Sequence, residues 1–331
     1  MPRTKKKLKA LLGILVSLLG LAWIGVTVGF GGLSSAFSQP IHFWFLLPFG
    51  IITILILILY GIRWKQLLDG RINLKEAIVS GMLCLGGNMF LPVRGGEILR
   101  LHYTHSMAAI PVAKLFSRLF VEKVIDLFSI AFIGLLAALF LRGTTLMSGA
   151  GELMFGTGVT LLFVLGVILV LKYCQTPLLG VIRPIFIRLK KEVMFERHVV
   201  RLIADSSLAF SPPFLAPPTV LTIFLWLTLY AAAYFFGGQL VGVNLSYPET
   251  LIVMFAGALG LMVPAAPSGV GTFHASVASS FLLLGRSLAE GLLLATVLHL
   301  LFFITIGLPA LSIYGYWHFK RHRTHSTEKH A

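Results

Sequence analysis

Residues 88–100, NMFLPVRGGEILR, decide how the rest of the chain is interpreted. Pro92 removes a backbone hydrogen-bond donor, and the Gly95–Gly96 pair permits a sharp change of direction directly after an apolar run. At membrane depth, irregular backbone is tolerated only where protein or a water-filled cavity surrounds it. We therefore predict that this segment is the tip of a re-entrant helical hairpin. A weaker copy is predicted at residues 260–274.

The composition indicates an all-α polytopic membrane protein. Apolar residues make up 57% of the 331 residues and charged residues only 12%. The formal net charge of +15 could suggest a nucleic-acid partner. In a chain this apolar, we interpret it as juxtamembrane charge that faces anionic lipid headgroups. The two cysteines provide neither a disulfide framework nor metal-ligand spacing.

The apolar runs predict about six full transmembrane helices plus two re-entrant hairpins. The run at 10–30 is longer than a signal-peptide core of about 7–15 residues, which favours an uncleaved first span. Residues 77–92 are too short for a crossing of about 20 residues, and basic residues flank them on both sides. The full spans are predicted at residues 10–30, 43–62, about 118–141, about 153–171, about 219–242 and about 288–316.

The basic residues also predict the topology. Most Lys and Arg residues fall on one side of the predicted spans, which places both termini in the cytoplasm of a cell (inner) membrane. The predicted parts are a basic head (1–9), a transmembrane domain (10–316) and a basic tail (317–331). The transmembrane domain divides into repeat one (43–141), a cytoplasmic amphipathic region (172–215) and repeat two (219–316). Charged and apolar positions alternate in that region, as in helices that lie on a membrane surface.

The two predicted hairpins resemble each other. Glu76 precedes Pro92 by 16 residues, and Glu249 precedes Pro264 by 15 residues. The basic residues place the first hairpin on the cytoplasmic face and the second on the opposite face, so we interpret the two units as an inverted repeat. Inverted repeats with discontinuous helices near the middle of the membrane are typical of secondary transporters.

Four charged residues, Arg118, Glu122, Lys123 and Asp126, begin the span at about 118–141. Arg118, Glu122 and Asp126 follow one another at intervals of four, so they share one helical face, and Arg118 can pair with Glu122. Asp126 lies two turns into the apolar run, where a lone acid costs about 2.5–3.5 kcal/mol on insertion scales. Two interpretations stay open: groups that face a polar cavity, or an interfacial ion pair that anchors the helix end.

The tips of the two hairpins carry the other candidate residues. Arg94 and Arg100 could form a basic pocket for a lipid phosphate, positioned by Glu97, or belong to a solvated cytoplasmic turn. The second tip, Pro267 to Gly271, resembles an anion-cradling loop that enters a helix.

Histidines offer weaker signals. His274 and His299 lie in apolar runs, where a histidine satisfied within the core is the commoner explanation. His102 and His105 are spaced i, i+3, but no further metal ligand lies nearby, so we expect no metal site. We also expect no cofactor. The sequence contains no Ser-His-Asp arrangement and no Walker loop, which makes an enzyme the less favoured class.

Three segments resemble a known family. NMFLPVRGGEILR, LFSRLFVEKVIDL and VPAAPSGVGTFHAS resemble the flippase-like family named for the membrane domain of lysylphosphatidylglycerol synthase, and the resemblance covers nearly all of residues 10–316. It implies a multi-spanning inner-membrane protein that translocates lipid. Full synthases also carry a soluble aminoacyl-transferase domain, which residues 1–331 do not contain, so lysyl transfer is not expected. The residues that match the family's motifs are Asn88, Pro92, Gly96, Glu97, Arg100, Arg118, Glu122, Asp126, Pro267, Gly269 and Gly271.

The sequence-based hypothesis is a carrier for an anionic phospholipid or a polyprenyl-phosphate-linked lipid. His274 departs from the family, which often has glutamate there, so the headgroup or coupling preference of the second hairpin stays open. The alternatives are a membrane-embedded transferase for lipid-linked substrates and a scaffold for a separate lipid-modifying enzyme. The predicted lipid-binding set is Asn88, Pro92, Arg94, Gly96, Glu97, Arg100, Arg118, Glu122, Asp126, Pro267, Ser268, Gly269, Gly271 and His274.

Overall fold

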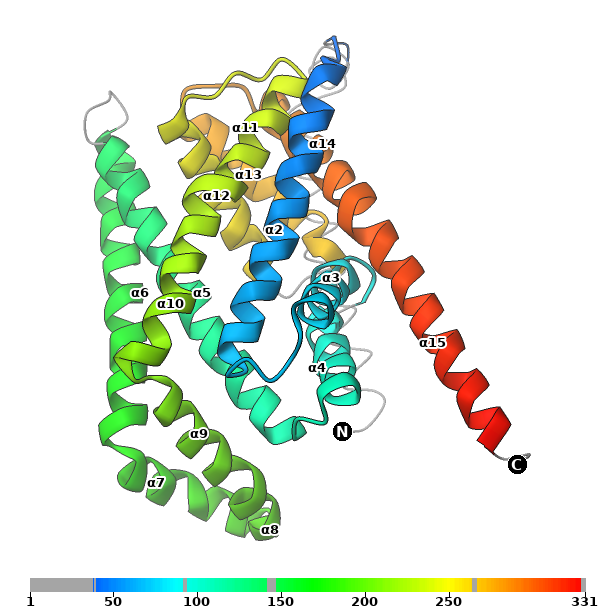
Figure 1. Cartoon of the computed structure of the whole chain (residues 1–331). Coiled ribbons are helices and arrows are strands. Elements are labelled where there is room, and N and C mark those ends of the chain that lie inside the picture. Colours follow the sequence, from blue (N-terminus) through cyan, green and yellow to red (C-terminus); the bar gives the residue numbers. More distant parts are fainter. Residues whose placement is uncertain (1–37, 39, 92–93, 142–146, 264–266, 329–331) are drawn as a thin grey trace. The chain divides into compact units, whose positions relative to one another are not determined.

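The computed structural model describes residues 38, 40–91, 94–141, 147–263 and 267–328 (Figure 1). All regular elements in this part of the chain are helices. Their order is η1 (Phe43–Phe45), α2 (Leu46–Leu67), α3 (Leu74–Phe90), α4 (Gly95–Ala108), α5 (Val112–Leu141), α6 (Met147–Tyr173), α7 (Gln175–Arg188), α8 (Glu192–Met194), η3 (Phe195–Val200), α9 (Arg201–Ala209), α10 (Pro212–Phe224), η4 (Leu225–Tyr230), α11 (Ala231–Leu240), α12 (Tyr247–Met262), η5 (Pro267–Gly269), α13 (Thr272–Leu283), α14 (Leu288–Phe302), η6 (Phe303–Gly307) and α15 (Leu308–Glu328).

The chain packs as two compact units. Unit 1 comprises residues up to 61, 78–100 and 229 onward, and unit 2 comprises residues 62–77 and 101–228. The chain passes between the units within the helices α2, α3, α4 and η4.

Five stretches of the described helices are long and apolar enough to cross a membrane, which confirms the polytopic all-helical class. They correspond to five of the six predicted spans. The sixth, at 10–30, lies outside the described residues. The five are Phe43–Leu67, Val112–Phe140, Phe155–Tyr173, Pro212–Leu240 and Leu288–Phe319.

The segment 88–100 lies where α3 folds back on α4 within unit 1. A Cβ atom added to Gly96 would lie 2.1 Å from the carbonyl oxygen of Cys84 and 2.6 Å from the amide nitrogen of Asn88. A Cβ added to Gly87 would lie 2.8 Å from the Cα of Gly96. The two helix backbones therefore touch, and only glycine permits this approach. At the far end of α3, Asn73 caps the helix by accepting a hydrogen bond from the amide of Glu76 (2.8 Å).

The second hairpin, α12 and α13, is built in the same way. Ser246 caps α12 in a reciprocal capping box with Glu249. Near the other end, a Cβ added to Gly260 would lie 2.7 Å from the carbonyl oxygen of Thr272, so α12 and α13 also approach backbone to backbone. At the open end of this hairpin, Arg286 Nε donates to Glu249 Oε1 (3.2 Å).

The two hairpins share their internal spacing. The cap residue precedes the contact glycine by 14 residues in both, from Asn73 to Gly87 and from Ser246 to Gly260. A glutamate follows the cap by three residues in both. The similarity of the predicted hairpins thus extends to how each helix begins and where its partner contacts it.

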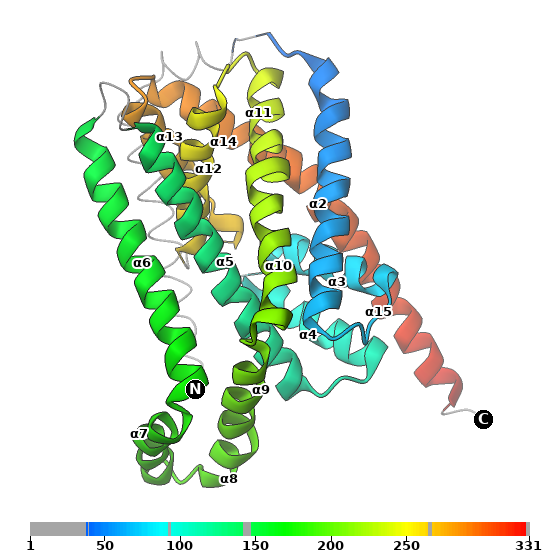
Figure 2. The same cartoon turned by 60° about the vertical axis from the view of Figure 1, so that its left-hand side comes forward.

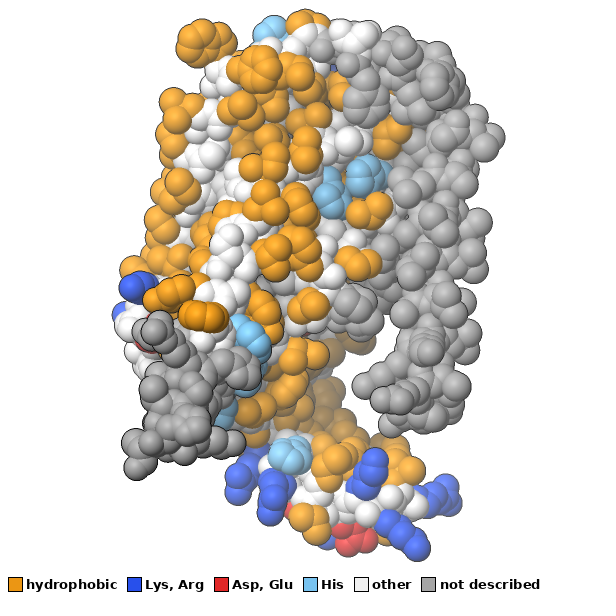
Figure 3. Space-filling model, turned by 90° about the vertical axis from the view of Figure 1, so that its right-hand side faces the viewer, with side chains coloured by type: hydrophobic (Ala, Val, Ile, Leu, Met, Phe, Trp, Pro, Cys, Tyr) orange, Lys and Arg blue, Asp and Glu red, His pale blue; other side chains and the backbone are white. Residues whose placement is uncertain are grey.

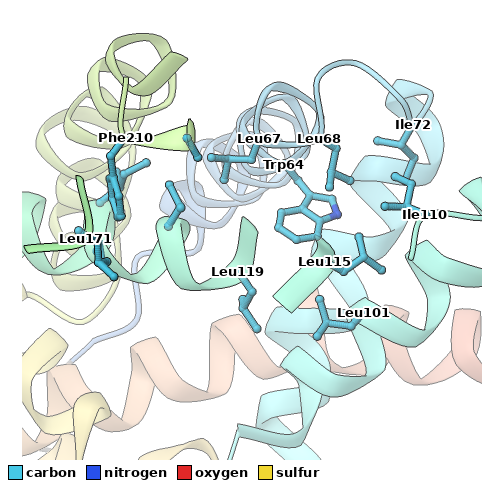
Figure 4. Close-up of a cluster of buried hydrophobic side chains, with 14 of the residues drawn as sticks. Trp64, Leu67, Leu68, Ile72, Leu101, Ile110, Leu115, Leu119, Leu171 and Phe210 are labelled. Atoms are coloured by element: carbon cyan, nitrogen blue, oxygen red, sulfur yellow. The ribbon is translucent and has the colours of Figure 1, made fainter. Parts of the chain in front are cut away.

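Unit 2 is organised around a core that joins α5 and α6 to the end of α2 and to α9. Trp64 is fully buried in this core (Figure 4). Its indole nitrogen donates to Thr104 Oγ1 (3.2 Å). The helices α7 to α9 continue from α6, and α7 lies across its end (Figures 1 and 2). The buried members of the core are Trp64, Leu67, Leu68, Ile72, Ala77, Leu101, Ile110, Leu115, Leu119, Val121, Val124, Ile125, Val164, Leu171, Ile203, Ala209 and Phe210.

We expect Gly96→Ala to destabilise the protein by about 1–3 kcal/mol, because the new methyl group meets backbone atoms that cannot move aside. Gly166→Ala in α6 is the matched control, since no atom lies within 4 Å of the added Cβ and alanine favours the helix. Thermal unfolding of the detergent-solubilised protein measures both. Equal unfolding midpoints for the two variants would contradict the close backbone contact between α3 and α4.

We expect Glu249 to make the stability depend on pH. Burial alone would raise the pKa of Glu249, but hydrogen bonds from Ser246 and the charge of Arg286 outweigh burial and lower it. Because the folded pKa is depressed, this contribution is complete above the ordinary value of about 4.3 and is lost as the pH falls through the lower folded value. The contribution is at most about 1 kcal/mol, since the pair is partly exposed.

The comparison of wild type with Glu249→Gln tests this. Wild type should be the more stable protein at neutral pH, and the difference between their unfolding midpoints should shrink on acidification. A difference that stays constant down to pH values below the ordinary pKa would refute the assignment.

Candidate functional site

The tip of the first hairpin contacts the second hairpin directly, and both lie in unit 1. Arg94 adopts a left-handed backbone conformation (φ 54°), which directs the chain into α4. Its Nη2 donates to the carbonyl oxygen of Leu261 (2.9 Å), and its Nη1 lies 3.7 Å from Glu97 Oε1. Leu261 belongs to the last turn of α12, where carbonyls have no partner within the helix and the helix dipole is negative. Arg94 therefore ties the first tip to the end of α12 while keeping 44% of its side chain exposed.

Asn88 closes the first tip from inside. Its side-chain oxygen accepts a hydrogen bond from the amide of Gly96 (3.0 Å), one of the otherwise unsatisfied amides at the start of α4. Pro92, the proline predicted to break the helix, lies outside the described residues.

Arg100 lies in α4 and is fully buried. Its Nη1 donates to the hydroxyl of Tyr60 (3.3 Å), and its guanidinium carbon lies 4.8 Å from the centre of the Tyr60 ring. These contacts anchor α4 on α2 within unit 1. The alternative interpretation, in which Arg100 belongs to a solvated turn, does not fit, because the side chain is inside the protein.

The second tip has an unusual backbone. Ser268, Gly269 and Gly271 all have positive φ angles, of 60°, 65° and 91°. Pro267 begins this turn, and Thr272 Oγ1 closes it by donating to the carbonyl of Gly269 (3.1 Å). The non-glycine Ser268 carries strain that the surrounding structure must hold.

His274 follows this turn and is 8% exposed. Its ring stacks on that of His299, with centroids 5.2 Å apart, and Phe273 meets both rings edge-on. The histidines that the sequence singled out separately thus lie together between α13 and α14. His274 Nδ1 is buried and has no hydrogen-bond partner within the described structure.

Arg118, Glu122 and Asp126 belong to unit 2, where a residue missed by the sequence analysis pairs with two of them. Arg63, 2% exposed, forms ion pairs with Glu122 and with Asp126 (2.5 Å), and it donates to Thr222 Oγ1 (3.0 Å). Thr222 in turn donates to the carbonyl of Pro218 (2.6 Å). Arg63 thus joins α2, α5 and α10 through charged and polar contacts that are nearly removed from water.

Arg118 does not pair with Glu122, as its spacing had suggested. It lies 3.3 Å from Asp69, which also pairs with Lys114 (3.0 Å), and its guanidinium stacks 4.5 Å above the ring of Phe214. Glu122 pairs with Arg63 instead. Both residues lie in α5, but their partners come from α2 and from the turn that follows it.

The sequence held one signal for Arg63. Two acids near the start of an apolar span require a compensating cation from another helix, but any of several basic residues could supply it. Arg63 directly follows the predicted span 43–62, so the sequence places it beyond the end of that span, whereas α2 continues through it to Leu67. Among the described residues, no group of three or more His, Cys, Asp or Glu side chains could hold a metal ion.

We expect Arg63→Met to destabilise the protein by about 3–5 kcal/mol, because it leaves two carboxylates without their shared cation. The double variant Arg63→Met/Asp126→Asn should lose less stability than the two single changes combined, since it removes one of the two carboxylates with which Arg63 pairs. Thermal unfolding in detergent measures all three variants. Additive losses would mean that Arg63 and Asp126 are not coupled.

Comparison with known proteins identifies the family of this chain. No curated protein and no solved structure matches the chain. A family model described as the lysylphosphatidylglycerol synthase TM region matches residues 10–310. This match includes both glycine-packed hairpins and the Arg63 network, and it confirms the resemblance read from the three motifs. The chain belongs to the family of lysylphosphatidylglycerol synthase transmembrane regions.

Proposed function

We propose that this protein is a carrier that moves an anionic phospholipid or a polyprenyl-phosphate-linked lipid across the inner membrane. The family and the apolar helices make it a multi-pass membrane protein with a role in lipid handling. The carrier function is a more specific proposal than a general role in lipid handling. It is supported above all by the contact between Arg94 at the first tip and the end of α12 in the second hairpin.

The shared construction of the hairpins supports an inverted repeat in which both are re-entrant. Each begins with a capped helix and reaches its tight glycine contact 14 residues after the cap. In this proposal both termini are cytoplasmic, and the two tips enter from opposite faces. If one repeat can open to one side of the membrane, its inverted copy can open to the other side at a similar free energy. Alternating access requires this equivalence.

Arg94 is the residue that we propose first meets the lipid phosphate. Its present partners are a neutral carbonyl and a carboxylate at 3.7 Å, and nearly half of its side chain is exposed. A phosphate offers a charged bidentate acceptor, which is a stronger partner for guanidinium than a single carbonyl. Binding would release the end of α12, so the lipid favours the conformation in which the two hairpins are separated.

The other predicted lipid-binding residues have supporting roles in this proposal. Asn88 and Gly96 shape the first tip, and Glu97 holds Arg94 in place when no phosphate is bound. The second tip offers its strained turn to the headgroup. The remaining predicted residues stay in the proposed set, namely Pro92, Arg100, Arg118, Glu122, Asp126, Pro267, Ser268, Gly269, Gly271 and His274.

A proteoliposome assay tests the carrier function. The purified chain is reconstituted with fluorescent phosphatidylglycerol or fluorescent phosphatidylcholine, and dithionite quenching measures how fast labelled lipid leaves the protected leaflet. We expect movement of the anionic lipid, and roughly a tenfold lower rate for Arg94→Gln, because a charge-assisted hydrogen bond contributes about 1.5–3 kcal/mol. Arg94→Lys should be intermediate, since it keeps the charge but loses the planar fork.

Arg71→Gln is the matched control, since Arg71 is an exposed arginine outside both hairpins. Equal rates for wild type, Arg94→Gln and Arg71→Gln would refute the role of Arg94, and no movement of any lipid would refute the carrier. Chromatography of the recovered lipid distinguishes the transferase alternative, in which the labelled lipid would be chemically altered. Movement only after a lipid-modifying enzyme is added would favour the scaffold.

A further inference from the structure

The segment between two adjacent candidate spans forms a projecting helical arm in unit 2. It comprises α7, α8, η3 and α9, residues 175–209, and we call it the arm. The preceding span ends at Tyr173 and the following span begins at Pro212. Consecutive spans enter and leave by the same face, so both ends of the arm are held at the membrane boundary.

One side of α7 packs on the unit 2 core through Leu178, Leu179 and Ile182. Another side presents apolar residues outward. Val181 and Ile185, one helical turn apart, are 72% and 56% exposed.

Apolar side chains are also exposed beyond the middle of α7. Leu189, at the end of the helix, is 59% exposed, and Val193 in α8 is 73% exposed. An apolar stripe that no described residue covers needs an apolar environment or a partner.

Basic side chains accompany the stripe. At the lower end of the view in Figure 3, Lys and Arg side chains lie among hydrophobic ones. The exposed acids of the arm are Glu192 and Glu196, and Glu196 pairs with Arg183 (3.7 Å). The excess charge of the arm is therefore positive, which complements an anionic surface. The exposed basic residues are Arg183, Arg188, Lys190, Lys191, Arg197 and Arg201.

The turn after α7 keeps a lysine where glycine is usual. The amide of Lys190 donates to Ile187 and the amide of Lys191 to Phe186, both at 2.9 Å, which is the hydrogen-bond pattern of a Schellman motif. Lys190 occupies its left-handed position with φ 54°. A lysine there is strained where glycine would not be, and the surrounding structure must hold that strain.

We propose that the arm docks on the bilayer that holds the protein. In the docked state the apolar stripe lies among the acyl chains, and the turn at Lys190 and Lys191 lies against the anionic headgroups. An exposed apolar stripe flanked by basic residues is the pattern of helices that lie in the membrane interface. α7 crosses the end of α6 and does not continue its direction (Figures 1 and 2), which suits that orientation. This site is separate from the hairpin tips and does not depend on the carrier function.

Site-directed spin labelling of the full-length reconstituted protein tests the proposal. Single cysteines replace Val181, Ile185 or Arg183 in a Cys174→Ser background. Cys84, which is 1% exposed, stays in place, and the unsubstituted background is the blank. Oxygen and a water-soluble nickel complex report lipid and water accessibility. In phosphatidylglycerol-containing vesicles, labels at 181 and 185 should favour oxygen, and the label at 183 should favour nickel.

A charge variant tests the headgroup preference. Each basic side chain near an anionic surface contributes roughly a fivefold factor to docking, so Arg188→Gln/Lys190→Gln/Lys191→Gln should weaken docking about a hundredfold. Its labels at 181 and 185 should then behave alike in phosphatidylglycerol and in pure phosphatidylcholine vesicles. The exposed pair Arg71→Gln/Lys75→Gln is the matched control and should leave the pattern unchanged. Lys190→Gly removes one charge and also relieves the strained turn, so this variant should not misfold. A partial loss of docking in Lys190→Gly is therefore due to the lost charge.

Two results would overturn the proposal. Nickel accessibility at 181 and 185 in anionic vesicles would place the stripe in water, where a soluble protein partner would have to cover it. An unchanged pattern in the triple variant would show that the basic residues do not recognise the headgroups.

Discussion

The contact between Gly96 and the backbone of Cys84 is the constraint on which the first hairpin depends. Helices in a membrane gain no hydrophobic energy by leaving lipid for one another, so they associate through close packing, and small residues permit that packing. Here the approach is so close that an added methyl group would overlap a carbonyl oxygen. Gly260 serves the same purpose against Thr272 in the second hairpin. With the backbones this close, each tip has a defined position, and Arg94 of the first can reach the end of α12.

The membrane environment also constrains where buried charges can lie. A buried ion costs several kcal/mol in lost hydration, and only a well-aligned partner compensates it. Arg63 satisfies this rule with two carboxylates and a threonine hydroxyl from two other helices. Such a network contributes little net stability compared with apolar packing, but it permits few alternative arrangements of α2, α5 and α10.

The two charged regions of this protein differ in how firmly they are held. Arg63 is almost fully buried and has ionic partners, whereas Arg94 is 44% exposed and bonds mainly to one carbonyl. A site that must bind and release a charged lipid needs contacts that can be exchanged. The firm network suits a structural role and the looser contact suits a lipid-binding role, which is why we centre the proposed function on the tip of the first hairpin.

The helical membrane class, the five described spans and the family could all be predicted from the amino-acid sequence, because apolar length and the three motifs are local properties of the chain. The candidate residues at the tips could be selected in the same way, since Pro and Gly next to charge are unusual in an apolar run. The partners of the charged side chains, in contrast, are known only from the folded structure. Spacing along one helix paired Arg118 with Glu122, yet Asp69 and Arg63 are their partners, because a side chain within a helix bundle is satisfied from neighbouring helices as readily as from its own. In the same way, apolar and basic positions alternate in the arm's sequence, but only its packing against the unit 2 core shows which apolar side chains stay exposed.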